Sequence, residues 1–346
     1  MVGYGEAKAE VGSTGKNAGL DALINEELSL LLVGEDARDI SRLWDVMYNG
    51  SRAHFAIDRG RVFPVLGRRG HLISAISGID MALWDILGKS LGEPVWRLLG
   101  GRRKVSYPAY ASGGWAPTAG IVEELQSFID RGNFKAVKMR VGAGDGTLAH
   151  SVERVKAARA GLAPDIDIMC DAHGTFSVAE AKRFCRELAD CNIGWLEEPV
   201  VADDKRGMAE VRASSDVPIS TGESEFTRFA FRDLAELRAC DIFQPDLSIC
   251  GGVTEAMRIE AIASAFQLRF APHLWGGALT FASGLHVLSV ASTGFIVEYS
   301  LGANPMLHEL VVEDFTVVDG HLEIPDRPGL GVTVDEEFVE KYRVKN

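Results

Sequence analysis

The sequence is poor in the residues that build disulfide scaffolds and zinc ribbons. It has five cysteines in 346 residues, an odd number with no C-x-x-C pair among them. Neither a disulfide framework nor a zinc ribbon is therefore expected. Free, buried thiols in a reducing compartment fit this usage better, and we expect a cytoplasmic protein.

Long hydrophobic runs and an excess of bases are missing as well. No stretch of about 18 uninterrupted apolar residues occurs, and the first residues have no basic segment followed by an apolar one. We therefore expect no membrane as a partner. The 36 bases against 49 acids give a net charge of −13, which argues against nucleic acid as a partner. A small anionic substrate stays compatible, because a bound metal ion can reverse the field inside one pocket.

Short β-rich runs alternate with amphipathic helical patterns from about residue 104 onward. Helical patterns such as 178–191 and 253–266 separate eight runs, at 105–111, 134–141, 166–171, 194–197, 217–223, 241–247, 269–273 and 295–300. Eight such units close a (β/α) barrel. The competing architecture, an open doubly wound sheet, usually has a Gly-rich phosphate turn after its first strand, and this chain has none.

The two ends of the chain have a different pattern. Residues 1–103 show helical stretches at 20–32, 37–48 and 74–91, whereas short strands are expected at 315–318 and 321–324. We predict a barrel over 104–304 and a separate helical layer over 1–103. Residues 305–346 are expected to pack back on that layer.

Three predicted strands end in an acid. Asp171, Glu197 and Glu223 follow apolar runs, and 26 residues separate each from the next. The carboxyl ends of barrel strands meet at one face, so the three carboxylates should converge. Such like charges repel one another, and a hard divalent cation with oxygen ligands, Mg²⁺ first, would relieve the repulsion. The alternative is that each acid only caps the helix that follows.

The next two strands end in Asp246 and His273. A carboxylate beside an imidazole can hold one ring nitrogen and leave the other to move a proton near neutral pH. The alternative is a structural histidine.

Basic residues are expected to point into the barrel from the second strand. Lys138 and Arg140 are two positions apart and share a face, whereas Lys135 should point outward. One of the two inward cations can hold a substrate carboxylate, while the other lies by the reacting carbon. Glu298, on the last strand, would donate a hydrogen bond to that carboxylate or to a developing enolate, or is an ordinary strand-end acid.

In this order, these residues resemble the mandelate racemase subgroup of the enolase superfamily. The resemblance covers nearly the whole chain, and the matching segments are Gly-Ile-Asp-Met-Ala-Leu-Trp-Asp at 78–85, Leu-Leu-Gly-Gly at 98–101, Lys138-x-Arg140, Asp171-x-His173, Glu197-Glu198-Pro199, Gly222-Glu223, Asp246 with Gly251-Gly252, His273 and Glu298. The resemblance implies a TIM-like (β/α)₇β barrel with an α+β capping domain built from both ends of the chain. It also implies Mg²⁺ held by Asp171, Glu197 and Glu223, abstraction of the proton next to a carboxylate to give an enediolate, and an even-numbered homo-oligomer.

One departure from the family pattern narrows the reaction that the resemblance implies. Racemases of this group have a lysine base where this chain has Arg140, and arginine keeps its proton. One-base chemistry through His273 and Asp246 is therefore expected. Sugar-acid dehydratases of the family can carry a histidine where His173 stands, either as a second acid or as a partner of a sugar hydroxyl.

The other departure lies at the start of the chain. In the family, further strands and a mobile loop precede the segment that matches residues 2–6, so either the natural start lies upstream or part of the lid is missing. We expect a magnesium-dependent dehydratase of an aldonic or aldaric acid that yields a 2-keto-3-deoxy acid. The alternatives are an epimerase, racemase or cycloisomerase of a related hydroxy acid or lactone, and an inactive metal-binding homologue with a truncated lid.

Overall fold

Strands and helices alternate through the middle of the chain in the computed structural model, which describes residues 1–8, 17–50 and 70–343. The strands are β1 (Ser106–Gly113), β2 (Ala136–Arg140), β3 (Asp167–Asp171), β4 (Ile193–Glu197), β5 (Ile219–Thr221), β6 (Ile242–Phe243), β7 (Arg269–Phe270) and β8 (Val297–Ser300). The helices between them are α7 (Ile121–Gly132), α8 (Leu148–Gly161), α9 (Val178–Glu187), α10 (Lys205–Ala213), α11 (Thr227–Glu236), α12 (Gly252–Ala265) and α13 (Ala278–Val290).

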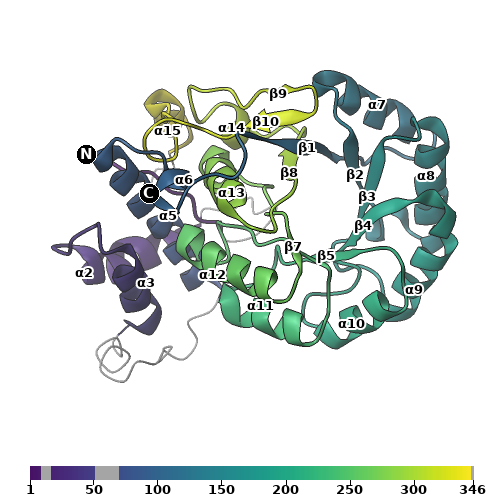
Figure 1. Ribbon diagram of the computed structural model, residues 1–346, viewed down its shortest axis with the longest axis horizontal. Coiled ribbons are helices and arrows are strands. Elements are labelled where there is room, and N and C mark those ends of the chain that lie inside the picture. The colour runs from purple at the N-terminus through teal and green to yellow at the C-terminus, as the bar shows by residue number, and fades with distance from the viewer. Residues whose placement is uncertain (9–16, 51–69, 344–346) are drawn as a thin grey trace.

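The strands form a closed ring. Each strand from β1 to β6 pairs in parallel with the next, and β8 pairs in parallel with β1. A parallel bridge between Phe270 and Gly294 brings the segment before β8 against β7. In Figure 1 helices α7 to α13 lie outside this ring. The predicted (β/α)₇β barrel is confirmed.

Side-chain alternation along β2 shows how the sequence directs residues to the two faces of the barrel wall. Val137 and Met139 belong to the large core between strands and helices. Ala136 belongs to the small cluster inside the ring. Lys138 and Arg140 share the inward face with Ala136, as their spacing predicts.

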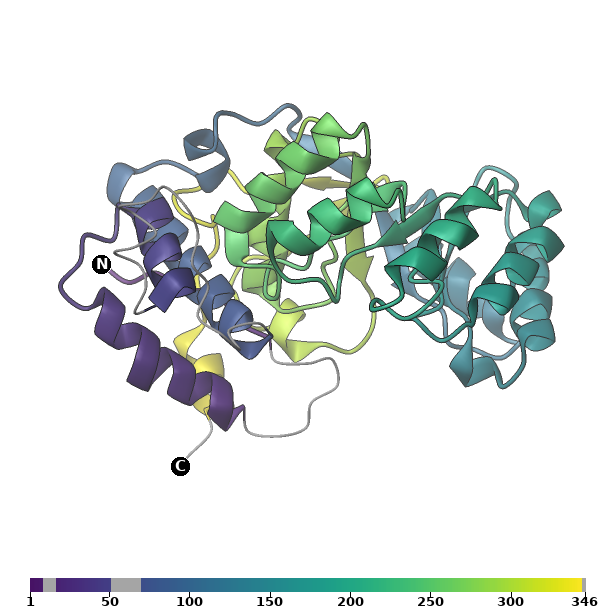
Figure 2. The same ribbon diagram turned by 90° about the horizontal axis from the view of Figure 1, so that it is seen from below.

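The first part of the chain forms a helical lobe beside the barrel (Figure 2). Its elements are α1 (Ala18–Ala22), the π-helical turn η1 (Leu23–Leu28), α2 (Ser29–Leu32), α3 (Ile40–Asn49), α5 (His71–Leu91) and α6 (Val95–Leu98). The three predicted helical stretches are confirmed. Two hydrogen bonds join this lobe to the turn before α12: Trp44 Nε1 donates to the Gly251 carbonyl at 2.8 Å, and Gly251 N donates to Ser77 Oγ at 2.9 Å.

The last segment contacts both the barrel and the helical lobe. Its strands β9 (Val317–Val318) and β10 (His321–Glu323) extend the sheet, because β10 pairs antiparallel with the start of β1. Later residues reach the helical lobe, where Leu330 N donates to Asp85 Oδ1 of α5 at 2.9 Å. The division into 1–103, 104–304 and 305–346 stays a prediction, and residues 9–16, 51–69 and 344–346 lie outside the described ranges.

The remaining short elements are η3 (Ala143–Asp145), η4 (Ala189–Cys191), α14 (Pro305–His308) and α15 (Glu336–Tyr342). Among the described helices, none combines the length and the apolar character needed to cross a bilayer.

Candidate active site

The three acids predicted as metal ligands lie together at the carboxyl ends of neighbouring strands. Asp171 closes β3 and is paired in register with Glu197, which closes β4, while Glu223 follows β5. Each side chain is buried. One oxygen from each of the three lies within 4.8 Å of the others. This is the spacing at which three carboxylates can share one cation.

Lys138 and Arg140 partly neutralise the acids. Lys138 Nζ lies 2.6 Å from Glu197 Oε1 and 2.8 Å from Glu298 Oε1. Arg140 Nη1 lies 3.0 Å from Asp171 Oδ2. Burial alone would lower the pKa of Lys138, but the charges of Glu197 and Glu298 raise it well above the usual value. Lys138 is therefore held as a cation and, in this arrangement, is not a base.

The negative charges of Asp171 and Glu198 are poorly compensated. Burial, followed by repulsion from Glu197, raises the pKa of Asp171 to about 7. Burial and the charge of Glu223 raise the pKa of Glu198 well above its usual value. Glu198 Oε1 and Glu223 Oε2 are buried and have no hydrogen-bond partner among the described residues. Unpartnered hard oxygen donors fit a divalent cation such as Mg²⁺.

Neighbouring side chains fix the orientation of Glu197. Its Oε2 accepts hydrogen bonds from Trp195 Nε1 at 3.1 Å and from Gln244 Nε2 at 2.8 Å, while Lys138 holds Oε1. Outer partners of this kind keep a metal ligand in one rotamer. The sequence did not single out Trp195 or Gln244, because nothing in their spacing shows which carboxylate they contact.

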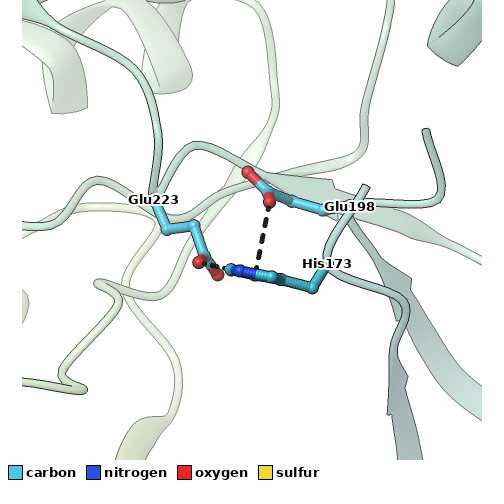
Figure 3. Close-up of side chains that lie close together, drawn as sticks. All are labelled: His173, Glu198 and Glu223. Atoms are coloured by element: carbon cyan, nitrogen blue, oxygen red, sulfur yellow. Dashed lines mark ion pairs between the residues drawn. The ribbon is translucent and has the colours of Figure 1, made fainter. Parts of the chain in front are cut away.

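His173 lies beside the acids, as Figure 3 shows. Its Nδ1 is 3.2 Å from Glu223 Oε1 and 3.9 Å from Glu198 Oε2. The hydrogen bond with Glu223 raises the pKa of His173. Both His173 and Glu198 have positive φ angles, 47° and 38°, which non-glycine residues adopt mainly where the surroundings impose them, often at functional sites. His173, Glu198 and Glu223 form a second set of groups that could hold a metal ion.

Asp246 and His273 form the predicted dyad. They are joined by a parallel bridge between the ends of β6 and β7, and His273 Nδ1 lies 2.9 Å from Asp246 Oδ2. With Nδ1 engaged there, Nε2 faces the metal ligands and lies 3.5 Å from Glu223 Oε2. Burial would lower the pKa of His273, but Glu223, Glu298 and Asp246 raise it to about 9.

Glu298 takes part in the same network. Its Oε1 accepts from Ser112 Oγ at 2.8 Å and its Oε2 accepts from Leu274 N at 2.8 Å. Burial would raise the pKa of Glu298, but Lys138 and His273 lower it to about 2. This arrangement makes Glu298 an ionised acceptor, and its donor role toward a substrate stays a prediction.

Family models match both parts of the chain. Residues 1–100 match the mandelate racemase / muconate lactonizing enzyme N-terminal domain, and residues 120–338 match the enolase C-terminal domain-like family. The chain belongs to this enzyme family within the enolase superfamily.

Named relatives extend over nearly the whole chain. Arabinonate dehydratase of Saccharolobus solfataricus is 34% identical over 100% of this chain and 88% of its own length. D-galactonate dehydratase of Variovorax paradoxus is 34% identical over 97% and 86%. D-galactarolactone cycloisomerase of Agrobacterium fabrum is 31% identical over 94% and 85%. The named relatives are thus lyases and an isomerase.

Solved structures agree with the fold. The 3,6-anhydro-D-galactonate cycloisomerase from Zobellia galactanivorans superposes with a TM-score of 0.87 at 32% identity, covering 99% of this chain and 91% of that one. A racemase from Streptomyces coelicolor with bound magnesium superposes with a TM-score of 0.83 at 31% identity, covering 96% and 86%.

Proposed function

We propose that this protein is a magnesium-dependent dehydratase of an aldonic or aldaric sugar acid. The observation that carries the proposal is that one imidazole faces the carboxylate cluster. His273 Nε2 lies 3.5 Å from Glu223 Oε2, while Asp246 holds Nδ1 of the same ring. The names of the dehydratase relatives support the substrate class.

The acids Asp171, Glu197 and Glu223 would hold Mg²⁺, which when bound supplies positive charge for the substrate carboxylate. Lys138 and Arg140 approach the same place as permanent cations. They would bind and orient the carboxylate and stabilise the negative charge that develops when the α-proton leaves.

His273 would remove the α-proton through Nε2 in its neutral form, while Asp246 keeps the ring in the tautomer that leaves Nε2 free. A cation bound at Glu223 would favour the neutral form, because the charge of Glu223 raises the pKa of His273. The β-hydroxyl then leaves as water, with its proton from His273 or from His173, and the enol product becomes a 2-keto-3-deoxy acid. His173 is a candidate acid because its side chain is 41% exposed at the edge of the cluster and its pKa is raised by the Glu223 hydrogen bond. Arg140 in place of a second base favours this one-base route over racemisation.

The direct test incubates the protein and Mg²⁺ with hexonic, pentonic and aldaric acids and measures 2-keto acid by its semicarbazone. We expect product from one or a few acids, abolished by EDTA and by His273→Asn. His321→Asn is the matched control, because His321 is an exposed histidine on β10, at the other end of β1. Absence of product from every acid, with Mg²⁺ still bound, would contradict dehydration and favour the inactive metal-binding alternative.

Cycloisomerisation is the second candidate, favoured by the relatives named as cycloisomerases at 31% and 32% identity. It shares the proton abstraction, but the group that leaves the β-carbon is a ring oxygen that stays in the molecule, so no water is lost. Conversion of a supplied lactone into an isomer of unchanged mass, measured by mass spectrometry, would identify it, whereas deuterium from D₂O in the recovered starting acid would identify epimerisation.

A further inference from the structure

The N-terminal segment reaches the proposed base from outside the barrel. The Glu6 carboxylate accepts from Gly277 N at 2.7 Å and from Thr280 N at 3.1 Å, at the start of α13. Two residues later, Lys8 N donates to the Ser248 carbonyl at 3.4 Å, beside the end of β6. Residues 6–8 are therefore attached to both loops that carry the Asp246–His273 dyad.

The side chain of Lys8 completes this attachment. Its Nζ donates to the Trp275 carbonyl at 2.7 Å and lies 3.4 Å from Asp246 Oδ2. Only 15% of the side chain is exposed. A cation in this position links the loop after β7 to the carboxylate at the end of β6.

The contacts of Asp246 show what Lys8 adds. Oδ1 accepts two hydrogen bonds from Ser248, from N at 2.8 Å and from Oγ at 2.5 Å. Oδ2 faces His273 on one side and Lys8 on the other. Burial would raise the pKa of Asp246, yet it is lowered to about 2, with Lys8 as the largest lowering influence and His273 next. Because Ser248 has no charge, the charge that compensates this buried carboxylate comes from Lys8 and His273.

We propose that Lys8 is a positioning residue of the reaction, the third member of a Lys8–Asp246–His273 chain that aims Asp246 Oδ2 at the imidazole. It touches neither the reacting carbon nor the metal ligands, and it acts through Asp246. The inference rests on the proposed function for the role of His273 as base, whereas the geometry of the chain can be tested without substrate.

The alternative function for a lysine here is to bind the far end of the substrate. The structure favours positioning, because the Trp275 carbonyl and Asp246 already hold Nζ and the side chain is mostly covered. The two functions predict different kinetics: loss of a positioning residue lowers kcat, whereas loss of a substrate contact raises KM.

The first experiment compares Lys8→Met, Lys8→Arg and the control Lys135→Met, since the Lys135 side chain is 62% exposed on the barrel wall. We expect Lys8→Met to lower kcat by about 10–100-fold, as loss of outer partners does, with KM and Mg²⁺ affinity within about twofold of the original protein. Lys8→Arg should recover most of the loss, and Lys135→Met should change neither constant. A rise in KM at unchanged kcat would overturn the proposal, as would equal losses in the Met and Arg variants.

The second experiment observes the hydrogen bond between Asp246 and His273 by proton NMR and needs no turnover of substrate. The proton on His273 Nδ1, shared with Asp246, should give a downfield proton resonance in the metal-loaded protein, assigned by its disappearance in His273→Asn. We expect Lys8→Met to shift or broaden that resonance and Lys8→Arg to keep it. An unchanged resonance in Lys8→Met would contradict the positioning role of Lys8, even if the variant were active. A shifted resonance in a protein that turns over no acid would keep the positioning role and count against the dehydratase reaction alone.

Discussion

The two halves of the site handle buried charge in opposite ways. In the metal half, formed by Asp171, Glu197, Glu198 and Glu223, carboxylates crowd together and two oxygens have no hydrogen-bond partner among the described residues. In the base half, formed by Asp246, His273 and Lys8, both oxygens of the carboxylate are engaged. The pKa of Asp171 is accordingly raised to about 7, whereas that of Asp246 is lowered to about 2.

The difference shows which carboxylates lack compensation. A buried charge is tolerated only where it is paired or hydrogen-bonded. The base half meets that condition with residues from three segments of the chain. The metal half meets it only in part, through Lys138 and Arg140 and through the histidines beside Glu223, which leaves Asp171 and Glu198 as the carboxylates that a divalent ion would stabilise.

The largest expected effect is a difference in Mg²⁺ affinity between variants of the metal half and variants of the base half. Glu197→Gln should abolish turnover and weaken Mg²⁺ binding by more than the roughly 10–100-fold that loss of an outer partner causes. His273→Asn should abolish turnover just as fully and leave Mg²⁺ binding within about twofold, because the imidazole is not a ligand of the Asp171, Glu197 and Glu223 set. Calorimetric Mg²⁺ titration and a turnover assay check both variants. An equal loss of Mg²⁺ affinity in Glu197→Gln and His273→Asn would contradict the division of the site into a metal half and a base half.

Asp246→Asn tests the base half alone. The amide cannot stabilise the imidazolium and favours the wrong tautomer, so kcat should fall by about 10⁴-fold, as the same change does in the serine-protease triad. KM and Mg²⁺ affinity should change little, since Asp246 contacts no metal ligand directly. Steady-state kinetics with the best acid of the panel measures this, and a retained kcat would mean that His273 works without its carboxylate.

Substitutions of Asp171 and Asp246 should change the free energy of unfolding in opposite directions. In metal-free protein at pH 8, Asp171→Asn should raise stability by about 1–2 kcal/mol, because it removes a repelled charge whose pKa burial and Glu197 raise to about 7. Asp246→Asn should lower stability, because it removes a well-paired carboxylate. Urea unfolding in EDTA provides both values, and shifts of the same sign would contradict the comparison.

The smallest expected effect is a pH dependence of the stabilisation by Mg²⁺. With the pKa of Asp171 raised from 3.8 to about 7, the folded metal-free protein binds more protons than the unfolded chain between these values, so its stability falls as pH rises through that window. Metal binding relieves the repulsion and competes with the proton. The rise in Tm on adding Mg²⁺ should therefore be a few °C larger at pH 8 than at pH 5. Thermal unfolding with and without EDTA tests this, and an equal rise at both pH values would argue against it.

The barrel and the meeting of the three acids at one face could be predicted from sequence because both follow from local patterns. Asp171 and Glu197 close apolar runs, and parallel strands bring their ends to one face. The predicted strands at 241–247 and 269–273 were too long, since β6 and β7 have two residues each. Pro245 and Pro272 have no N–H to continue the ladder just before Asp246 and His273.

The groups that sequence reasoning missed depend on backbone turns and on distant segments. Glu198 follows Glu197, and strand alternation would send it to the opposite face. Its φ of 38° turns it toward His173 instead. The Glu-Glu-Pro segment was a signal that both acids matter, but not that they meet at one place. Lys8 had no signal of any kind, because its partner Asp246 is 238 positions away.

The 238 positions between Lys8 and Asp246 have a consequence for the order in which the parts of the site form during folding. The three acids proposed to hold Mg²⁺ lie within one stretch from residue 171 to residue 223, so neighbouring β/α units suffice to bring them together. The dyad acquires Lys8 only when the first residues of the chain dock against the ends of β6 and β7. Contacts between distant segments form late during folding. In a refolding time course, Mg²⁺ binding should therefore recover before catalytic turnover does.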